Sequence, residues 1–242
     1  MNKSLDIFEI RKSIKDKVLV NNVSISLHPG EIVGLLGPNG AGKTTCFYLI
    51  AGIEKTENGV IRLDDTDITA MNLAQRALSG LAYLPQEASI FQSLSVEDNL
   101  RVAIELIGVT DENEITKIIG TFLEQMHLTH LAKTRGTNLS GGERRRVEIA
   151  RLLCTNPKYI LLDEPFAGID PISVIETQYL IAQLSSKGIG VLITDHNYRE
   201  LLSICKRVYF LYEGSILVEG NETEITSHPI VKKIYLGESE FK

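Results

Sequence analysis

Three apolar runs in the chain predict strands that are covered on both faces, as in the centre of a parallel sheet: 32–36, 159–162 and 191–194. Each run leads directly into residues that could bind a ligand or take part in catalysis. The first is followed by a glycine-rich loop, the second by Asp163 and Glu164, and the third by Asp195 and His196. Open α/β sheets bind their ligands outside the carboxyl ends of the strands. The pattern therefore predicts an α/β core with one site at that edge.

Short β-rich runs near both ends of the chain predict further strands. They lie at 6–10 and 18–26 in the N-terminal part, and at 207–212 and 215–219 in the C-terminal part. Only Glu213 and Gly214 separate the late pair, which is typical of a tight hairpin turn. We therefore expect an antiparallel β layer beside the core.

The stretch from about 95 to 158 has helical periodicity instead. Ser95, with Asp98 three residues later, resembles a capping-box helix start. Farther on, apolar residues at spacings of three and four form one helix face: Ile115, Ile118, Ile119, Phe122, Leu123 and Met126. We expect one domain over 1–242, with a helical subdomain inserted at about 88–158 and a C-terminal tail at about 221–242.

Length and composition exclude several classes of protein. The 242 residues carry 25 Lys and Arg against 31 Asp and Glu, a net charge of −6 that disfavours nucleic acid as the main partner. No apolar run approaches the roughly 18 residues needed to cross a bilayer, and the N-terminus has no apolar signal core, so we expect a cytoplasmic protein. Buried, reduced thiols are expected for the three cysteines, which form no C-x-x-C pair: Cys46, Cys154 and Cys205.

The most specific motif is a loop of the pattern G-x-x-x-x-G-K-[ST], formed by Gly37, Pro38, Asn39, Gly40, Ala41, Gly42, Lys43 and Thr44. Its glycines let backbone N–H groups converge on phosphate oxygens at the positive end of the following helix. Lys43 would contact the β- and γ-phosphates, and the Thr44 hydroxyl is a hard oxygen suited to Mg²⁺. The loop and the adjoining Thr45 therefore predict ATP binding.

Asp163 and Glu164 are weak evidence alone, because acidic pairs at strand ends are common. Beside a phosphate loop they become strong evidence, since one carboxylate can support a magnesium shell while the other polarises an attacking water.

The segment 139–143 reads LSGGE and opens a predicted helix with an inner face of Val147, Ala150, Leu153 and Cys154. Ser140 is a good N-cap, and Gly141 and Gly142 leave backbone N–H groups bare, which makes a second anion-binding helix end. Three arginines follow, and we interpret them as a solvated face rather than a nucleic-acid patch: Arg144, Arg145 and Arg146.

Taken in chain order, these motifs resemble those of the ABC-type ATPases. The resemblance also includes Gln86 in LPQ, the segment 167–170 and His196, and it covers nearly the whole chain. It implies a C2 homodimer in which each phosphate loop faces the LSGGE segment of the partner, the signature loop (139–143), across one ATP.

The same resemblance implies how ATP and its metal ion would be held. Lys43 and the loop amides would bind the phosphates. Thr44 and Gln86 would be Mg²⁺ ligands, with Asp163 acting through water.

For hydrolysis the resemblance implies that Glu164 is the general base and that His196 contacts the γ-phosphate beside it. Asp170 would lie at the dimer seam. The signature residues would serve the opposite site: Ser140, Gly141, Gly142 and Glu143.

One residue departs from the family pattern. An aromatic side chain usually stacks on adenine near the start of the second strand, and the matching residue here is Ile14. An aliphatic side chain should hold the base more loosely, so we expect weak discrimination between ATP and GTP.

Other segments resemble the branch that powers lipopolysaccharide extraction from the inner membrane of diderm bacteria: 84–91, 142–151, 163–174, 192–197 and 235–238. This implies two polytopic inner-membrane subunits as partners. The ATPases of branched-chain amino-acid importers are the alternative. A soluble ABC protein of DNA repair or translation is disfavoured, because the chain has no second cassette, no long coiled-coil insert and no basic surface.

Phe91 is the candidate anchor for a coupling helix of the membrane subunits, and packing between the lobes is the alternative. Gln92 and Ser93 stand where basic residues often follow this phenylalanine, so an ion pair with the partner is in doubt. The tail ends a helix at Gly237 and suits dimerisation or regulation better than catalysis.

Overall fold

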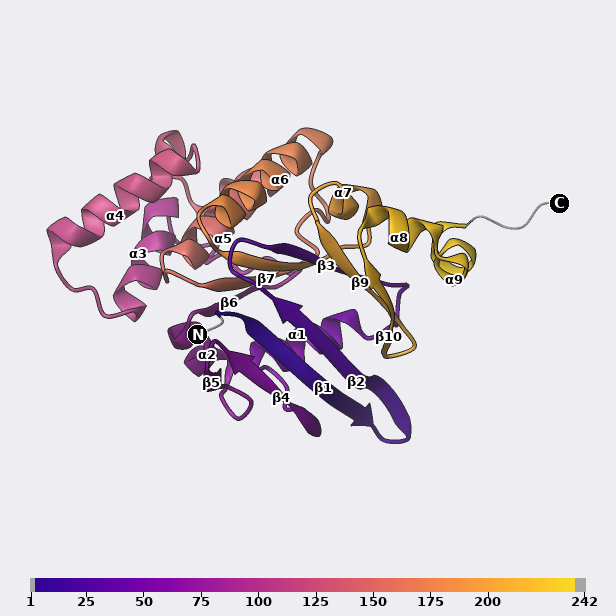
Figure 1. The fold of residues 1–242 in the computed structure, drawn as a ribbon. Helices are drawn as coiled ribbons and strands as arrows, with labels where there is room; N and C mark the ends of the chain where they lie inside the picture. The colour runs from indigo at the N-terminus through magenta and orange to yellow at the C-terminus, as the bar shows by residue number, and fades with distance from the viewer. Residues whose placement is uncertain (1–2, 238–242) are drawn as a thin grey trace.

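The structure, a computed structural model, describes residues 3–237 and contains two sheets (Figure 1). The smaller is antiparallel, with the order β2-β1-β4-β5. Its strands are β1 (Leu5–Ile14), β2 (Lys17–Leu27), β4 (Asn58–Leu63) and β5 (Thr66–Asp67). This sheet confirms the expected antiparallel layer, although β1 and β2 are longer than predicted because they continue through register shifts to a tight hairpin.

The larger sheet has the order β10-β9-β3-β8-β7-β6. All its neighbouring strands pair in parallel except β10, which runs antiparallel to β9. The strands are β3 (Ile32–Leu36), β6 (Leu81–Leu84), β7 (Tyr159–Asp163), β8 (Gly190–Thr194), β9 (Arg207–Tyr212) and β10 (Ser215–Gly220). The predicted late hairpin is thus present, and its first strand joins the core sheet beside β3.

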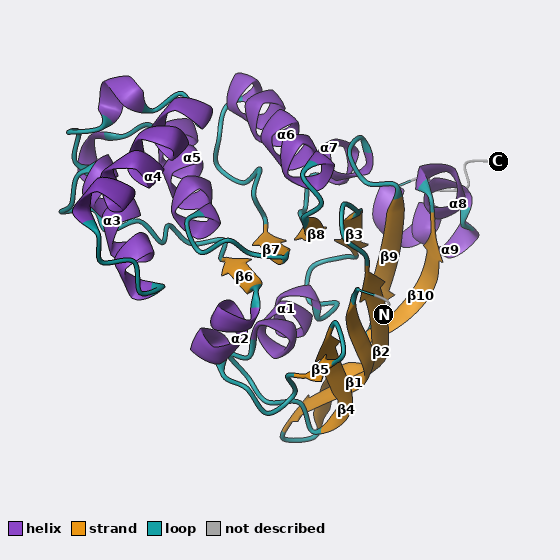
Figure 2. Ribbon diagram, turned by 60° about the vertical axis from the view of Figure 1, so that its left-hand side comes forward, coloured by secondary structure: helices purple, strands orange, loops and turns teal. Residues whose placement is uncertain are grey.

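Helices cover both faces of this sheet, and Figure 2 shows α1 and α2 on one side and α6 and α7 on the other. The N-terminal group is α1 (Lys43–Ala51) and α2 (Leu73–Ser79), and the later pair is α6 (Pro171–Ser186) and α7 (Tyr198–Leu202). The chain then continues through α8 (Glu222–Ser227), α9 (Pro229–Val231) and the π-helix η3 (Lys232–Leu236), which ends at Gly237 as predicted.

A further group of helices lies to one side of the sheet (Figure 1). It contains α3 (Val96–Leu106), α4 (Glu112–Gln125) and α5 (Gly141–Leu153), with the short 3-10 turns η1 (Thr129–Leu131) and η2 (Gly136–Asn138). Ser95 caps α3 by accepting the N–H of Asp98, as the sequence predicts. Within residues 3–237, no helix is both long and apolar enough to cross a membrane.

Two apolar clusters hold these layers together. One fills the space between the antiparallel sheet, α1 and the core sheet, and the other joins the opposite face of the core sheet to α3–α6. The three cysteines are buried and free. Because the central strands are buried on both faces, only their carboxyl ends present polar groups, and these groups meet at one edge of the sheet.

Candidate active site

The phosphate loop lies between β3 and α1 with no room for side chains at two of its glycines. A Cβ on Gly37 would lie 2.1 Å from the carbonyl oxygen of Leu211, and one on Gly42 would lie 2.4 Å from that of Leu19. Both glycines also have positive φ angles, 153° and 107°. No side chain caps α1, so the N–H groups of its first turn stay free to bind an anion.

Lys43 projects from the first turn of α1 back over this loop. Its Nζ donates to the carbonyl oxygens of Gly37 at 2.7 Å and Pro38 at 3.1 Å. Burial lowers the pKa of the Lys43 ammonium, whereas the nearby carboxylates, Glu164 first, act to raise it. The ammonium therefore lies where a phosphate oxygen could replace its carbonyl partners, and Thr44 and Thr45 follow it in the same turn.

The acidic pair ends β7, where β6 and β8 flank it in register. Asp163 is buried, and its Oδ2 accepts the Tyr83 hydroxyl at 3.1 Å. Burial raises the pKa of the Asp163 carboxyl to about 6, and the Tyr83 hydrogen bond opposes this rise. Tyr83 is a site residue that the sequence analysis missed, although the short apolar run of β6 that precedes Gln86 was a signal.

Glu164 is the point where three elements converge. Its Oε2 accepts Gln86 Nε2 at 2.7 Å and lies 3.2 Å from His196 Nδ1. Its backbone has a φ of 46°, a left-handed conformation that costs a non-glycine residue roughly 1–3 kcal/mol. The structure thus brings together three of the predicted site residues, and it holds the carboxylate in a strained loop.

The signature segment begins α5 with a capping box. Ser140 Oγ accepts the N–H of Glu143 at 3.3 Å, and the Glu143 carboxylate accepts the N–H of Ser140 at 2.8 Å. Gly142 lies against α6, where a Cβ would be 2.2 Å from Ser173 Oγ. The predicted N-cap is therefore confirmed, and the predicted inner face is buried: Val147, Ala150, Leu153 and Cys154.

The interpretation of all three arginines as a solvated face was wrong for Arg145. Its side chain is only 7% exposed, and it pairs with Glu148 at 3.1 Å. It also donates to the carbonyl oxygen of Pro85 at 3.3 Å, just before Gln86. Arg145 therefore connects α5, which begins with the signature segment (the signature helix), to the loop that carries Gln86 (the glutamine loop).

Asp170 has a local role that the sequence analysis did not assign. Its Oδ1 accepts the N–H groups of Ile172 and Ser173 at 3.0 and 3.1 Å, so it is the N-cap of α6. Its proposed place at the dimer seam is a separate prediction.

A cleft of about 220 Å³ lies between the start of α5 and the loop after β7. Gln86 and Glu164 line it together with Gly141 and Gly168, but none of the residues 37–45 does. Within one chain, the cleft beside the signature loop therefore opens onto Gln86 and Glu164 and not onto the phosphate loop.

Phe91 lies outside the site, 46% exposed, and the guanidinium of Arg151 lies 4.9 Å from the centre of its ring. Arg151 is fixed by hydrogen bonds to the Ser89 carbonyl and hydroxyl oxygens. Both side chains line a groove of about 380 Å³ with apolar residues of α2 and α3, including Leu73 and Leu106. The groove is a candidate contact surface.

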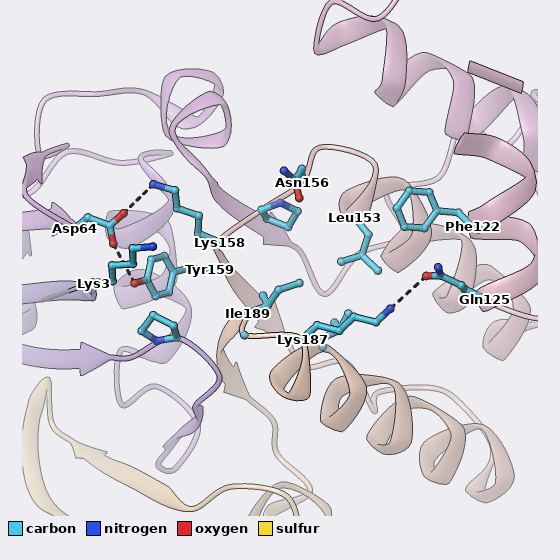
Figure 3. A pocket seen from close by; sticks show the side chains of 14 residues that line it. Lys3, Asp64, Phe122, Gln125, Leu153, Asn156, Lys158, Tyr159, Lys187 and Ile189 are labelled. Carbon is cyan, nitrogen blue, oxygen red and sulfur yellow. Dashed lines mark hydrogen bonds and ion pairs between the residues drawn. The ribbon is translucent and has the colours of Figure 1, made fainter. Parts of the chain in front are cut away.

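A different groove, of about 440 Å³, lies at the opposite end of β7 (Figure 3). Lys158 and Tyr159 line it, both bound to Asp64, and none of the predicted site residues does. It is separate from the chemistry described above.

Comparison with known proteins identifies the class of this site. The family model described as ABC transporter matches residues 20–167. The chain belongs to the ABC transporter family. The phosphate loop, the acidic pair and the signature helix are thus parts of an ATP-hydrolysing cassette.

The similar proteins are close and full-length. The chain is 50% identical over 229 residues to the lipopolysaccharide export system ATP-binding protein LptB of Escherichia coli K12, covering 95% of each. It is 50% identical to LptB of Acidithiobacillus ferridurans over 98% of each chain, and 46% identical to LptB of Haemophilus influenzae over 96% of each. A nucleotide-free ATP-binding cassette from an ABC transporter superposes with a TM-score of 0.88 at 30% identity, covering 98% of this chain and all of that one.

The base-binding side of this cassette gives a testable prediction. Ile14 ends β1, is 52% exposed and is aliphatic, so it can offer no aromatic face to adenine. Stacking on an aromatic side chain is worth about 1–3 kcal/mol per base. We expect ATP and GTP to compete comparably for the site in an equilibrium competition assay. Replacing Ile14 by tyrosine should tighten the binding of both nucleotides, since either base can stack on the ring. A wild-type preference for ATP of about a hundredfold would contradict the prediction.

Proposed function

We propose that the chain is the ATP-hydrolysing subunit of a transporter that extracts lipopolysaccharide from the inner membrane and exports it towards the outer membrane. The observation that carries this proposal is the identity of 46–50% over nearly the full length to LptB proteins of three organisms. Neither the amino-acid importer nor the soluble non-transport ATPase is favoured by these relatives.

Hydrolysis is assigned to Glu164, Lys43 and His196. A water held by Glu164 would give up its proton to the carboxylate while attacking the γ-phosphorus. Gln86 and His196 both contact Oε2 of Glu164, which leaves Oε1 available to that water. Lys43 would exchange its loop carbonyls for phosphate oxygens and offset the negative charge of the transition state.

Mg²⁺ is the expected cofactor, and the donor atoms fit it because they are hard oxygens. Thr44 offers a hydroxyl, Asp163 a carboxylate and Gln86 its Oε1, since the Gln86 amide nitrogen is already bound to Glu164. A cation beside Asp163 would also offset the burial that raises the pKa of this carboxyl. When bound with ATP, the ion would neutralise phosphate charge.

A homodimer would complete each site with the signature loop of the other copy. In support, the cleft of about 220 Å³ beside Gly141 of one chain is lined by Glu164 and by none of the residues 37–45. Ser140 and Gly141 are exposed at the start of α5, where a γ-phosphate of the opposite site could bind them. Loss of that phosphate would weaken the dimer.

The partners we propose are two polytopic inner-membrane subunits, LptF and LptG, together with LptC. They would hold the chain on the cytoplasmic face of the inner membrane, and no nucleic acid is involved. The groove beside Phe91 suits a short apolar helix, because apolar side chains line much of it. The guanidinium of Arg151 in this groove already contacts the phenyl ring of Phe91.

We also infer that 88–158 is an inserted subdomain and that 221–242 is a tail with a regulatory or dimerising role. Tyr235 of the tail packs on Tyr198 and Phe210, at 5.7 and 5.3 Å between ring centres, so the tail is anchored beside α7. Glu238, the last residue of the tail motif, lies outside the described residues.

Replacement of Phe91 by alanine should weaken the membrane complex. Loss of a buried aromatic anchor from an interface typically costs 2 kcal/mol or more, so we expect the amount of LptF and LptG that copurifies to fall roughly tenfold or more. The measurement is pull-down from detergent-solubilised membranes. Phe8→Ala is the matched control, because Phe8 is 48% exposed on β1 and lies outside the groove. Equal recovery with both variants would reject the proposed contact.

The cargo is tested by depletion. Removing the protein from its diderm host should leave newly made lipopolysaccharide in the inner membrane, as measured by membrane fractionation. Undiminished delivery to the cell surface would reject the proposed function. If depletion abolished amino-acid uptake and left lipopolysaccharide delivery unchanged, the result would favour the alternative function, the ATPase of an amino-acid importer.

A further inference from the structure

Asp195 is buried between the two loops that carry Glu164 and His196. Its carboxylate is fully buried, with 0% exposure. Oδ2 accepts the backbone N–H of Phe166 at 3.0 Å, in the loop after β7, and Oδ1 accepts that of Asn197 at 2.8 Å, in the loop after β8. A buried carboxylate needs hydrogen-bond donors to offset the loss of water, and these two backbone N–H groups provide them.

The first part of the loop after β7 is attached to the end of β8 and to the residue that follows it through two N–H groups. Glu164 donates its N–H to the Thr194 carbonyl oxygen at 2.7 Å, and Phe166 donates to Asp195. Pro165, between them, has no N–H. These two bonds hold Glu164 in the left-handed conformation, with a φ of 46°, that residues other than glycine rarely adopt.

His196 depends on the same carboxylate for its place. Its side chain is 59% exposed, so packing constrains the ring little, and its Nδ1 lies 3.2 Å from Glu164 Oε2. The residues on both sides of it are fixed, because Asp195 is buried and binds the N–H of Asn197. His196 Nδ1 also lies 3.5 Å from Asp195 Oδ1. Asp195 therefore helps to set the distance between the imidazole and the Glu164 carboxylate, together with the bond from the Glu164 N–H to Thr194.

We propose that Asp195 is a positioning residue that aligns Glu164 with His196 for hydrolysis. The inference rests on the proposed ATPase function and adds to it a residue that would touch neither ATP nor the metal ion. This role requires a carboxylate, because the two N–H groups bind different oxygens of Asp195 and an amide has only one oxygen. In an Asp195→Asn variant, the amide nitrogen would face one of the two N–H groups, and that loop would be released.

The test is the steady-state kinetics of Asp195→Asn, with Asp65→Asn as the matched control. Asp65 is exposed in the turn between β4 and β5, outside the site. A displacement of about 1 Å among reacting groups can cost roughly a hundredfold in rate, so we expect kcat to fall by about 10- to 100-fold. The KM for ATP should change less than kcat, since the two hydrogen bonds of Asp195 go to Phe166 and Asn197 and its charge alone acts on Lys43.

Turnover is normalised to ATP-binding sites titrated on the same preparation, so that loss of folded protein lowers the number of sites and not the rate per site. A wild-type rate per site in Asp195→Asn would overturn the inference, and so would parallel losses of ATP affinity and kcat. If the wild-type protein itself showed no ATPase activity, the proposed function would fail instead, and the two failures are therefore distinguishable.

Discussion

Glu164→Gln is expected to lower steady-state ATP hydrolysis by about 10²- to 10⁴-fold while ATP binding is retained. The amide cannot take up the proton of the attacking water, which removes general-base catalysis. The geometry should survive, because the glutamine Oε1 can still accept Gln86 Nε2, which lies 2.7 Å from the carboxylate in the structure. Lys43 and the phosphate loop, to which we assign ATP binding, are unchanged.

Phosphate release and equilibrium ATP binding are measured on the same preparation. Glu222→Gln is the control, because it makes the same change at an exposed position on α8. ATP-bound dimers should accumulate in Glu164→Gln, since the bridging phosphate is no longer removed. Hydrolysis at the wild-type rate would show that another group accepts the proton.

Much of the site could be predicted because each functional group follows a strand of the core sheet. The apolar runs were identified within one residue of β3, β7 and β8, and parallel pairing brings their carboxyl ends together. Asp163 and Thr194 are direct neighbours in this pairing. The strand pattern therefore predicted that the acidic pair and His196 share one edge of the sheet, and the family resemblance added that His196 lies beside Glu164.

Arg145 could not be assigned from its neighbours in the sequence. Three consecutive arginines look equivalent, but successive residues of a helix point about 100° apart, so the three side chains have different surroundings. Arg145 meets Glu148 and the Pro85 carbonyl, whereas Arg146 pairs with Glu176 nearer the surface. Only the packing of α5 against the glutamine loop decides which arginine is buried.

Other features depended on long-range pairing or on a signal that was present but not used. The parallel pairing of β9 with β3 joins residues more than 170 positions apart, and no local pattern encodes it. The cap of α6 was readable, since Asp170 followed by Pro171 is a typical N-cap and first helical residue.

Ser140→Arg is expected to bind ATP but to form no ATP-dependent dimer and to hydrolyse ATP at a small fraction of the wild-type rate. Ser140 is exposed at the start of α5, where the proposed partner phosphate would approach, and an arginine there adds bulk to the interface. The cleft at the start of α5 is lined by none of the residues 37–45 of the same chain, so the phosphate loop should keep its affinity. Mass measurement by light scattering, with and without ATP, reports the dimer.

The substitution also removes a helix cap, which costs about 1 kcal/mol of stability by itself. Asn72→Arg separates the two effects, because Asn72 and Gln75 form a capping box of the same kind on α2, outside the signature segment and the tail. Both variants should lose similar stability in thermal unfolding, but only Ser140→Arg should stay monomeric with ATP. If Ser140→Arg dimerised and turned over ATP like Asn72→Arg, each chain would have to complete its own site, and the sharing of ATP between two copies would be wrong.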